Sequence, residues 1–309
     1  MSDIIGTRIH ATLVETFRRY LFTAHRVAES EPDLREAFWE ALGRDRFIAQ
    51  HPILTAIPAY ATGPSLRRLA AQGQEAAPRI HESLLVLSEA DRPLYDHQVS
   101  AITSIQHGRS VVIATGTGSG KTESFLLPIL DEIVRKPRAG VRAFIVYPLN
   151  ALANDQLRRL RQMLAGFSEI TFGRYTGETP QSVADLTEAE VREILTPNER
   201  ADRNAIRTSP PHIVLTNFAM LEYLLLRPQD SPLFDGGSLQ YIVLDEAHTY
   251  QGAQGIDVGL LMRRLTKRVG RALQFVLTSA TLGGDEQTIK TFAQNLTGAT
   301  FSADDIITG

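Results

Sequence analysis

The sequence contains no cysteine, no long apolar run and no strong excess of charge of either sign. Without cysteine, these 309 residues hold no disulfide, no cysteine-ligated zinc and no iron–sulfur cluster. No apolar run approaches the roughly 18 residues that a membrane-spanning helix needs. The start, Met1-Ser2-Asp3-Ile4-Ile5, lacks a basic segment followed by an apolar one, so we expect no secretory signal, no membrane partner and a cytoplasmic location.

The near balance of charge limits what the whole chain can bind by electrostatics alone. There are 32 Lys and Arg against 35 Asp and Glu, a net charge of −3. Any nucleic-acid surface must therefore be a local patch, because the chain as a whole is not basic. The length and the 43% hydrophobic content predict a globular protein of one large or two ordinary domains.

Residues 1–91 read as a mostly helical accessory region. A second helix starts at Pro32 and stops at Gly43, and two short helices are predicted at 65–73 and 78–87. No catalytic constellation is evident in this region. The first helix is predicted by apolar residues that recur every four positions, namely Ile5, Ile9, Leu13, Phe17 and Leu21.

From residue 92 to 309 the pattern changes to alternating strands and helices, which predicts an α/β domain with a parallel sheet covered on both faces. A long polar, proline-containing insertion at 177–211 interrupts the alternation and is either functional or mobile. A final helix is predicted at about 285–296. The expected strands are short apolar runs at 110–114, 141–146, about 170–174, 212–216, 240–245 and 273–278.

The clearest motif is Ala-Thr-Gly-Thr-Gly-Ser-Gly-Lys-Thr at residues 114–122, between a β-branched run and an amphipathic segment. Strand, glycine-rich turn and helix form the context of a phosphate-binding loop, in which backbone N–H groups converge on an anion. Lys121 would reach the β- and γ-phosphates, and the Thr122 hydroxyl would bind Mg²⁺. Thr115 stands where the general pattern has glycine, a substitution common in nucleic-acid helicases. On this motif alone, a glycine-rich turn with an unrelated lysine remains the alternative.

An acidic pair, Asp245-Glu246-Ala247-His248, ends a later predicted strand. The C-terminal edge of a parallel sheet is where such folds bind ligands. Asp245 would hold Mg²⁺ through the water shell of the ion, and Glu246 would orient and deprotonate the water that attacks the γ-phosphate. An acidic helix cap is the alternative for the tetrapeptide alone. The predicted catalytic residues are therefore Lys121, Asp245 and Glu246.

The segment Thr278-Ser279-Ala280-Thr281 follows the next predicted strand. Its hydroxyls are placed to hydrogen-bond with Glu246 or His248, so that the phosphate state could be felt at a neighbouring surface. As an isolated signal it is weak, because Ser and Thr are common at strand ends. The predicted coupling residues are His248, Ser279 and Thr281.

The segment Leu94-Tyr95-Asp96-His97-Gln98 precedes the first strand of this domain. The Gln98 amide could read an adenine edge bidentately, and Tyr95 could stack on the base. A helix start capped by Asp96 is an equal alternative on local grounds. The predicted nucleotide contacts are Tyr95, Gln98, Thr115, Gly116, Thr117, Gly118, Ser119, Gly120, Lys121, Thr122 and Glu123.

In chain order these segments resemble the glutamine motif and motifs I, II and III of superfamily-two DExH-box helicases. Residues 147–156 resemble motif Ia, 175–179 motif Ib and 215–222 motif Ic of the same family. Residues 248–265 are similar to the YprA/MrfA and Lhr-like bacterial DNA helicases, a group that includes antiphage-defence helicases. The resemblance covers about residues 92–300 and implies a RecA-like fold.

The resemblance also implies a path for a single nucleic-acid strand along motifs Ia, Ib and Ic. Short polar side chains and backbone amides there could hold phosphates without reading bases. Each could instead be an ordinary cap or turn residue, and Asn150 could cap a helix that begins at residue 151. The implied contacts are Pro148, Asn150, Asn154, Thr176, Gly177, Thr216 and Asn217.

By resemblance, the chain is expected to be the ATP- and Mg²⁺-dependent motor domain of a DNA helicase or translocase, the front part of a larger protein. Family members place arginine fingers in a second RecA-like domain, which would come from the same chain or a partner. Since no such motif is present before Gly309, we expect the chain alone to hydrolyse ATP negligibly. The alternatives are an RNA-remodelling DExH ATPase, a double-strand DNA translocase of a defence or restriction complex, and a non-catalytic module that uses nucleotide for assembly.

Overall fold

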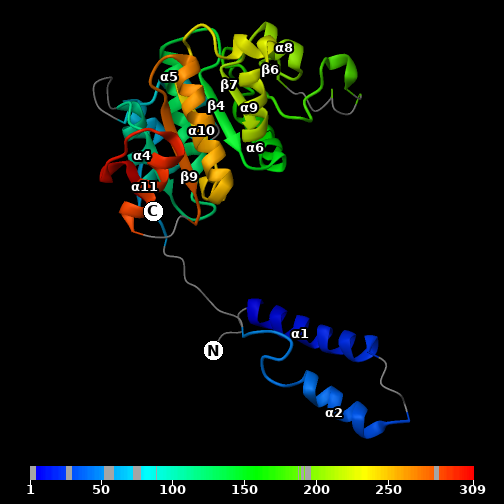
Figure 1. Ribbon diagram of the computed structural model, residues 1–309. Helices are drawn as coiled ribbons and strands as arrows, with labels where there is room; N and C mark the ends of the chain where they lie inside the picture. Colours follow the sequence, from blue (N-terminus) through cyan, green and yellow to red (C-terminus); the bar gives the residue numbers. More distant parts are fainter. Residues whose placement is uncertain are drawn as a thin grey trace. The chain divides into compact units, whose positions relative to one another are not determined.

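The computed structural model of the chain divides into two units, Met1–Ala59 and Tyr60–Gly309 (Figure 1). Residues 60–91 group with the larger unit, although their sequence reads as part of the helical accessory region. The functional division at residue 92 stays a prediction. The structure describes residues 5–25, 30–51, 59–71, 78–87, 89–186, 188, 191, 196–281 and 285–309.

The smaller unit is a pair of helices joined by aromatic contacts. The ring of Phe22 lies 6.0 Å from that of Phe38 and 5.1 Å from that of Trp39, measured between centroids. The Arg18 guanidinium lies 3.8 Å from the Trp39 ring centroid, a cation–π contact. Two helices, as predicted, are α1 (Ile5–Ala24) and α2 (Pro32–Leu42).

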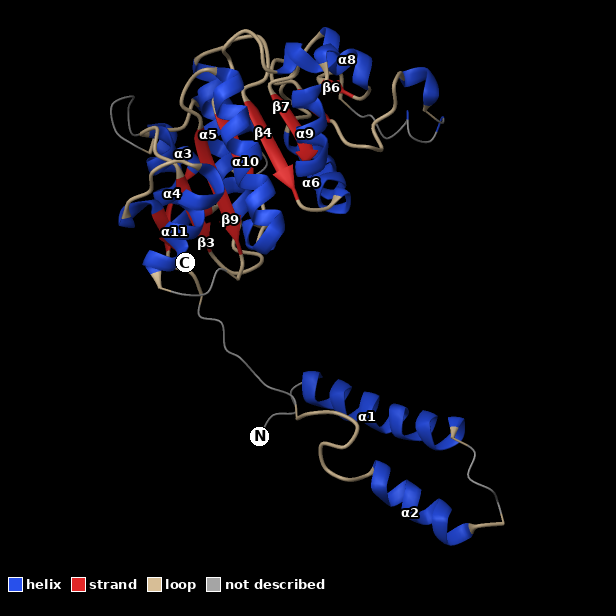
Figure 2. Cartoon of the chain, viewed as in Figure 1, coloured by secondary structure: helices blue, strands red, loops and turns tan. Residues whose placement is uncertain are grey.

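The larger unit is built on a parallel sheet, whose strands are red in Figure 2. The strand order is β10-β3-β9-β8-β4-β7-β5-β6. The predicted parallel sheet is confirmed, and β6 and β10 extend it at its two edges. Neither edge strand was predicted; β6 comes from the 177–211 insertion. The strands are β3 (Val111–Ala114), β4 (Ala143–Tyr147), β5 (Phe172–Arg174), β6 (Glu199–Arg200), β7 (Ile213–Asn217), β8 (Tyr241–Leu244), β9 (Gln274–Ser279) and β10 (Ile306–Thr308).

Helices cover both faces of this sheet, because its central strands are apolar on both sides. Along β4, Ala143, Ile145 and Tyr147 pack in one buried cluster, and Phe144 and Val146 pack in the other. The first cluster includes residues of α4 (Asp96–Gln106), α5 (Lys121–Arg135) and α6 (Asn150–Met163). The second includes residues of α9 (Phe218–Leu226), α10 (Gly252–Val269) and α11 (Glu286–Thr297).

Shorter elements complete the larger unit. An antiparallel pair joins β1 to β2 ahead of α4. Within the described ranges, no helix combines the length and apolarity needed to cross a bilayer. The shorter elements are β1 (Thr62–Ser65), α3 (Leu66–Ala71), η1 (Glu82–Val86), β2 (Pro93–Tyr95), η2 (Val183–Asp185), α8 (Arg203–Thr208), η3 (Pro228–Leu233), η4 (Ala247–Thr249) and η5 (Ala303–Asp305).

The topology places the six predicted motifs that follow strands at the same edge of the sheet, whereas the glutamine motif precedes β3. The loops after β3, β8 and β9 carry the phosphate-loop, acidic and hydroxyl motifs, and these three strands are neighbours. The loops after β4, β5 and β7 carry the segments similar to motifs Ia, Ib and Ic, and these strands are also neighbours. The sheet therefore presents two adjacent groups of functional candidates, which we call the nucleotide edge and the strand path.

Candidate functional site

The phosphate loop between β3 and α5 has the backbone that its glycines permit. Gly118 and Gly120 lie in the left-handed region, with φ of 75° and 76°. A Cβ on Gly120 would also collide with the side-chain amide of Gln98, whereas a Cβ on Gly118 would meet nothing within 4 Å. The Thr115 and Ser119 hydroxyls are 2.7 Å apart and hydrogen-bond to each other within the loop.

Lys121 begins α5 and points back into the loop. Its ammonium donates to the carbonyls of Thr115 at 3.0 Å and Gly116 at 3.1 Å. Burial lowers the pKa of Lys121, and the negative charges of Glu246 and Asp245 oppose that shift. The structure therefore brings the lysine and the acidic pair into one site. Thr122 and Glu123 follow in the first turn of α5, and Thr117 is exposed on the loop.

Asp245 lies at the end of β8, tied to the neighbouring strand β9. The Thr278 hydroxyl donates to Oδ1 of Asp245, and the Glu246 N–H lies 3.2 Å from the same oxygen. Burial raises the pKa of the Asp245 carboxyl, because a charged carboxylate is poorly solvated there. A divalent cation at this point would offset that cost.

The protein oxygens near Asp245 suit a cation that keeps most of its water ligands. Over the described residues, no group of three or more His, Cys, Asp or Glu converges to hold a metal. Mg²⁺ is usually bound by one or two protein oxygens together with water and substrate phosphates. Binding of a nucleotide-borne Mg²⁺ by the Thr122 hydroxyl and, through water, by Asp245 stays a prediction.

Glu246 has two unusual features. Its backbone is left-handed, with φ of 50° and ψ of 46°, which is uncommon for a residue other than glycine. Its Oε2 is buried and accepts no hydrogen bond within the described part of the chain, although it lies 3.4 Å from Nδ1 of His248. An unsatisfied buried carboxylate oxygen on a strained backbone is costly for the fold, and such features cluster at functional sites.

The hydroxyl motif reaches the acidic motif as expected from the strand order. The Ser279 hydroxyl lies 3.1 Å from Nδ1 of His248, and the Thr281 N–H donates to the same hydroxyl at 3.1 Å. The Ser279 carbonyl accepts from the Thr115 N–H at 3.1 Å, so the motif also contacts the phosphate loop. The contacts are present; coupling through His248, Ser279 and Thr281 stays a prediction.

Gln98 is fully buried and its amide is used within the chain. Its Nε2 donates to the Gly120 carbonyl at 3.0 Å, and its Oε1 accepts from the Tyr95 N–H at 2.9 Å. Gln98 therefore joins the start of α4 to the phosphate loop, and Asp96 makes no cap there. Adenine recognition by Gln98 and Tyr95 remains a prediction.

Four contacts around the phosphate loop had no sequence signal. The Tyr60 hydroxyl accepts from the Gly116 N–H at 3.1 Å across 56 residues of sequence. The Tyr60 ring lies 5.4 Å from Tyr95 and 5.0 Å from His97, and Nε2 of His97 lies 2.9 Å from the Ser119 carbonyl. Tyr60 follows a proline-containing connector without periodicity, so nothing local predicted its place.

Glu123 lies beside Gln98 and pairs with Arg159 of α6. Both side chains border a groove of about 270 Å³ next to the start of α5. The same groove is lined by the apolar side chains of Leu66, Leu87, Leu94 and Leu127. Glu89, Arg92 and Gln162 also line the groove, so it offers a small ligand both apolar contacts and polar groups.

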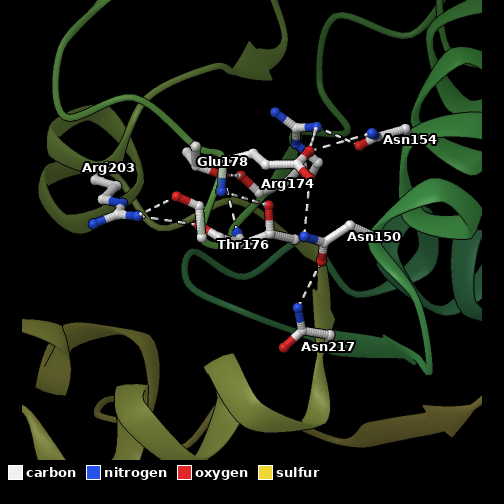
Figure 3. Close-up of polar contacts among 9 residues, drawn as sticks. Asn150, Asn154, Arg174, Thr176, Glu178, Arg203 and Asn217 are labelled. Carbon is white, nitrogen blue, oxygen red and sulfur yellow. Dashed lines mark hydrogen bonds and ion pairs between the residues drawn. The ribbon is translucent and has the colours of Figure 1, made fainter.

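The strand path is organised around a residue that the sequence did not single out (Figure 3). The Glu178 carboxylate accepts from the Asn150 amide at 3.0 Å and from the Asn154 amide at 3.3 Å. Arg174 lies 3.3 Å from the same carboxylate and also donates to Oδ1 of Asn154. The Asn217 amide donates to Oδ1 of Asn150 at 2.7 Å. The structure thus brings together residues after β4, β5 and β7.

The possibility that Asn150 is merely a helix cap is not what the structure shows. Helix α6 begins at Asn150 itself and Leu149 occupies the cap position, without a side-chain cap bond. Asn217 does cap a helix, since its Oδ1 accepts from the Met220 N–H at 2.7 Å at the start of α9. Pro148 is half-buried just before α6.

Hydrogen bonds to η3, β7 and α8 hold the loop that contains Thr176 and Gly177. The Tyr175 hydroxyl donates to the buried Asp230 at 2.7 Å, and the Thr216 hydroxyl donates to the Tyr175 carbonyl at 2.7 Å. Arg203 of α8 donates to the carbonyls of Thr176 at 3.2 Å and Gly177 at 3.1 Å. Thr216 is fully buried, so its side chain supports this loop. The insertion therefore supports the strand path through α8.

The fold and these contacts define a P-loop nucleotide-binding protein with a second polar site at the same sheet edge. The chain belongs to the DEAD/DEAH box helicase family, whose model matches residues 95–289. This confirms the resemblance that the motifs indicated.

Individual relatives agree with the family assignment. The chain is 30% identical to the Druantia protein DruE of Escherichia coli, over 94% of this chain and 21% of DruE. It is 33% identical to the ATP-dependent helicase YprA of Bacillus subtilis, over 66% of this chain and 24% of YprA. Among solved structures, the DUF1998 helicase MrfA bound to DNA matches with a TM-score of 0.60 and 30% identity, over 82% of this chain and 31% of MrfA. The chain thus spans between about a fifth and a third of these relatives.

Proposed function

We propose that this chain is the ATP-binding motor domain of a DNA helicase or translocase that works with a second RecA-like domain. One observation carries the proposal: the buried, unsatisfied Oε2 of Glu246 lies in the same site as Asp245 and Lys121. A carboxylate held in this way is suited to orient a water and accept its proton. Similarity to the named ATP-dependent helicase YprA supports the same activity.

The residues of the nucleotide edge divide the work. Lys121 would leave the carbonyls of Thr115 and Gly116 and bind the β- and γ-phosphates, with backbone N–H groups of the glycine-rich loop around them. Thr122 and Asp245 would hold Mg²⁺, which neutralises charge on the phosphates. Glu246 would hold the attacking water, and the second domain would supply the arginine that phosphoryl transfer of this kind uses.

The groove beside Gln98 and Glu123 is the proposed site of the adenine base. Its apolar walls would contact the faces of the base, and the Gln98 amide lies at its margin. Tyr95, which packs with Tyr60 and His97 beside the phosphate loop, would border the opposite side of the base. ATP and Mg²⁺ are the proposed cofactors of the complete protein.

The strand path is the proposed contact with DNA. Asn150, Asn154 and Asn217 present side-chain amides, and Thr176 and Gly177 lie on the adjoining loop. Polar side chains of this kind bind phosphates without base readout. DNA is favoured over RNA because the MrfA match, at 30% identity, is to a DNA-bound structure. Similarity to a Druantia protein supports a place among the defence helicases.

Two substitutions test the assignment by separating binding from chemistry. Lys121→Ala should weaken binding of a fluorescent ATP by roughly 1.5–3 kcal/mol, about tenfold to a hundredfold, because charge-assisted bonds to phosphate are lost. Glu246→Gln should bind ATP normally and, with the second RecA-like domain supplied, lose at least about a hundredfold in turnover.

Lys136→Ala is the matched control, since Lys136 is exposed and pairs with Glu132 at the far end of α5. It should leave ATP affinity unchanged. Equal affinity of wild type and Lys121→Ala would refute the phosphate loop. Turnover by Glu246→Gln within threefold of wild type would remove Glu246 as the base.

A further inference from the structure

The donors at the centre of the strand path already hold an anion, and that anion is part of the chain. Amide nitrogens of Asn150 and Asn154 and the guanidinium of Arg174 converge on the two oxygens of Glu178 (Figure 3). Carboxylate oxygens and the non-bridging oxygens of a phosphodiester accept hydrogen bonds from the same donors at the same distances. The geometry of an anion site is therefore present without a nucleic acid.

We propose that the Glu178 carboxylate is an internal stand-in for a strand phosphate, which occupies Asn150, Asn154 and Arg174 until a single strand displaces it. This inference rests on the proposed DNA-binding function of the strand path. It assigns to Glu178 a negative role: the residue competes with the ligand and does not help to bind it.

The charge state of Glu178 suits this role. Hydrogen bonds from Asn150 and Asn154 lower the pKa of the Glu178 carboxyl, so it is ionised at neutral pH. An ionised carboxylate at this point repels a phosphate that approaches the same donors. It also neutralises Arg174, the cation in this group of contacts.

Glu178 can leave without loss of the fold. Its side chain is 50% exposed, and the neighbouring Gly177 has nothing within 4 Å of the position of a Cβ. The loop is held by other contacts, from Tyr175 to Asp230 and from Arg203 to the carbonyls of Thr176 and Gly177. When the carboxylate moves away, the donors of α6 remain fixed, because Asn150 is still held by Asn217.

The test is binding of a fluorescent oligothymidylate to the 309-residue chain, measured by anisotropy over a series of salt concentrations. Glu178→Gln and Glu178→Ala should both bind about threefold to tenfold more tightly than wild type at low salt, because a repelling charge is gone. The slope of log affinity against log salt should change little, because a bound strand makes the same phosphate contacts in wild type once Glu178 is displaced.

Asp155→Asn is the matched control. It makes the same change in charge on the next residue of α6 after Asn154, and Asp155 is exposed and paired with Arg158 at 3.0 Å. It should change affinity less than twofold. Thermal unfolding of each variant verifies that it is folded.

The outcomes separate this inference from the function on which it rests. If wild type binds and both Glu178 variants bind equally or more weakly, Glu178 is a positioning residue and the inference is wrong, while the proposed function stands. If wild type and all variants fail to bind at any salt, the proposed DNA-binding function fails and the inference fails with it. Tighter binding by Asp155→Asn equal to that of Glu178→Gln would show a general charge effect and would also overturn it.

Discussion

The nucleotide edge and the strand path lie side by side on one sheet, yet they are prepared for their ligands in opposite ways. At the nucleotide edge, Glu246 keeps a buried oxygen without a hydrogen bond and Asp245 has a pKa raised by burial. In the strand path, Asn150, Asn154 and Arg174 are all satisfied by Glu178. The nucleotide edge therefore destabilises the folded chain through buried carboxylates. In the strand path, the donors are already hydrogen-bonded to a side chain of the chain itself.

This difference suits the two proposed ligands. A nucleotide with Mg²⁺ brings both positive and negative charge, so it can interact favourably with the Asp245 and Glu246 carboxylates and with the half-buried ammonium of Lys121 together. A single strand brings only a repeating negative charge, and a protein that moves along it must release each phosphate again. An internal carboxylate that returns to the donors would assist that release.

The largest expected effect breaks the nucleotide edge at its backbone. Gly120→Ala places a side chain at a left-handed position and drives its Cβ into the Gln98 amide, so it should lower the free energy of unfolding by about 2–4 kcal/mol. Gly118→Ala has the same left-handed strain with open space around the Cβ and should cost only about 1 kcal/mol. Chemical denaturation of both variants measures the difference.

Equal losses for the two glycine variants would mean that backbone strain alone matters and that the Gln98 contact does not. The contrast also bears on function. Gly120→Ala should lose ATP binding together with stability, whereas Gly118→Ala should keep a measurable affinity.

An intermediate effect comes from the raised pKa of Asp245. A carboxyl whose pKa is higher in the folded than in the unfolded chain holds its proton longer when folded, so stability falls as pH rises between the two values. The whole cost is present once the pH lies above the pKa of Asp245 in the folded chain. Asp245→Asn removes the charge and should raise the free energy of unfolding of the nucleotide-free chain by about 1 kcal/mol, or about 1–2 °C in Tm.

The same comparison near the ordinary pKa of an aspartate should show no gain, because wild-type Asp245 is then protonated in the folded chain. A gain that is constant across pH would point to packing and not to charge. With ATP and Mg²⁺ added at neutral pH, wild type should gain more stability than the variant.

The sequence was sufficient for the elements and residues that local pattern determines. Apolar runs located the central strands β3, β4, β7, β8 and β9 to within about two residues, because strands buried on both faces are apolar throughout. The edge strands β6 and β10 are two and three residues long and carried no such run. The position of α11 was also predicted correctly.

The site residues divide in the same way, into those that a local motif predicts and those that only the fold brings together. Lys121, Asp245 and Glu246, which the structure brings into one site, were predicted because each belongs to a short pattern with a known context. The contacts from Tyr60 to Gly116, from Thr278 to Asp245 and from Glu178 to Asn150 join segments that are distant in sequence. Such pairs depend on strand order, which one sequence does not reveal. The support that α8, within the insertion at 177–211, gives to the strand path was likewise not predictable from one sequence. Residues 187, 189–190 and 192–195 of the insertion lie outside the described part.

The smallest expected effect sharpens the comparison at Asn217, where a structural and a binding role meet in one side chain. Its Oδ1 caps α9 and its Nδ2 donates to Asn150. Asn217→Ser keeps a capping oxygen and loses the bond to Asn150, so the free energy of unfolding should change by less than about 0.5 kcal/mol. Affinity for an oligothymidylate should fall about twofold to fivefold, because one donor of the strand path loses its orientation.

Asn217→Ala serves as the reference, since it removes the cap as well and should cost about 1 kcal/mol in the free energy of unfolding. Denaturation and anisotropy on the two variants then separate the roles. If serine destabilises the chain as much as alanine does, the bond to Asn150 belongs to the fold. If serine changes neither stability nor affinity, Asn217 is a helix cap only, and the strand path must be redrawn around Asn150, Asn154 and the loop at Thr176.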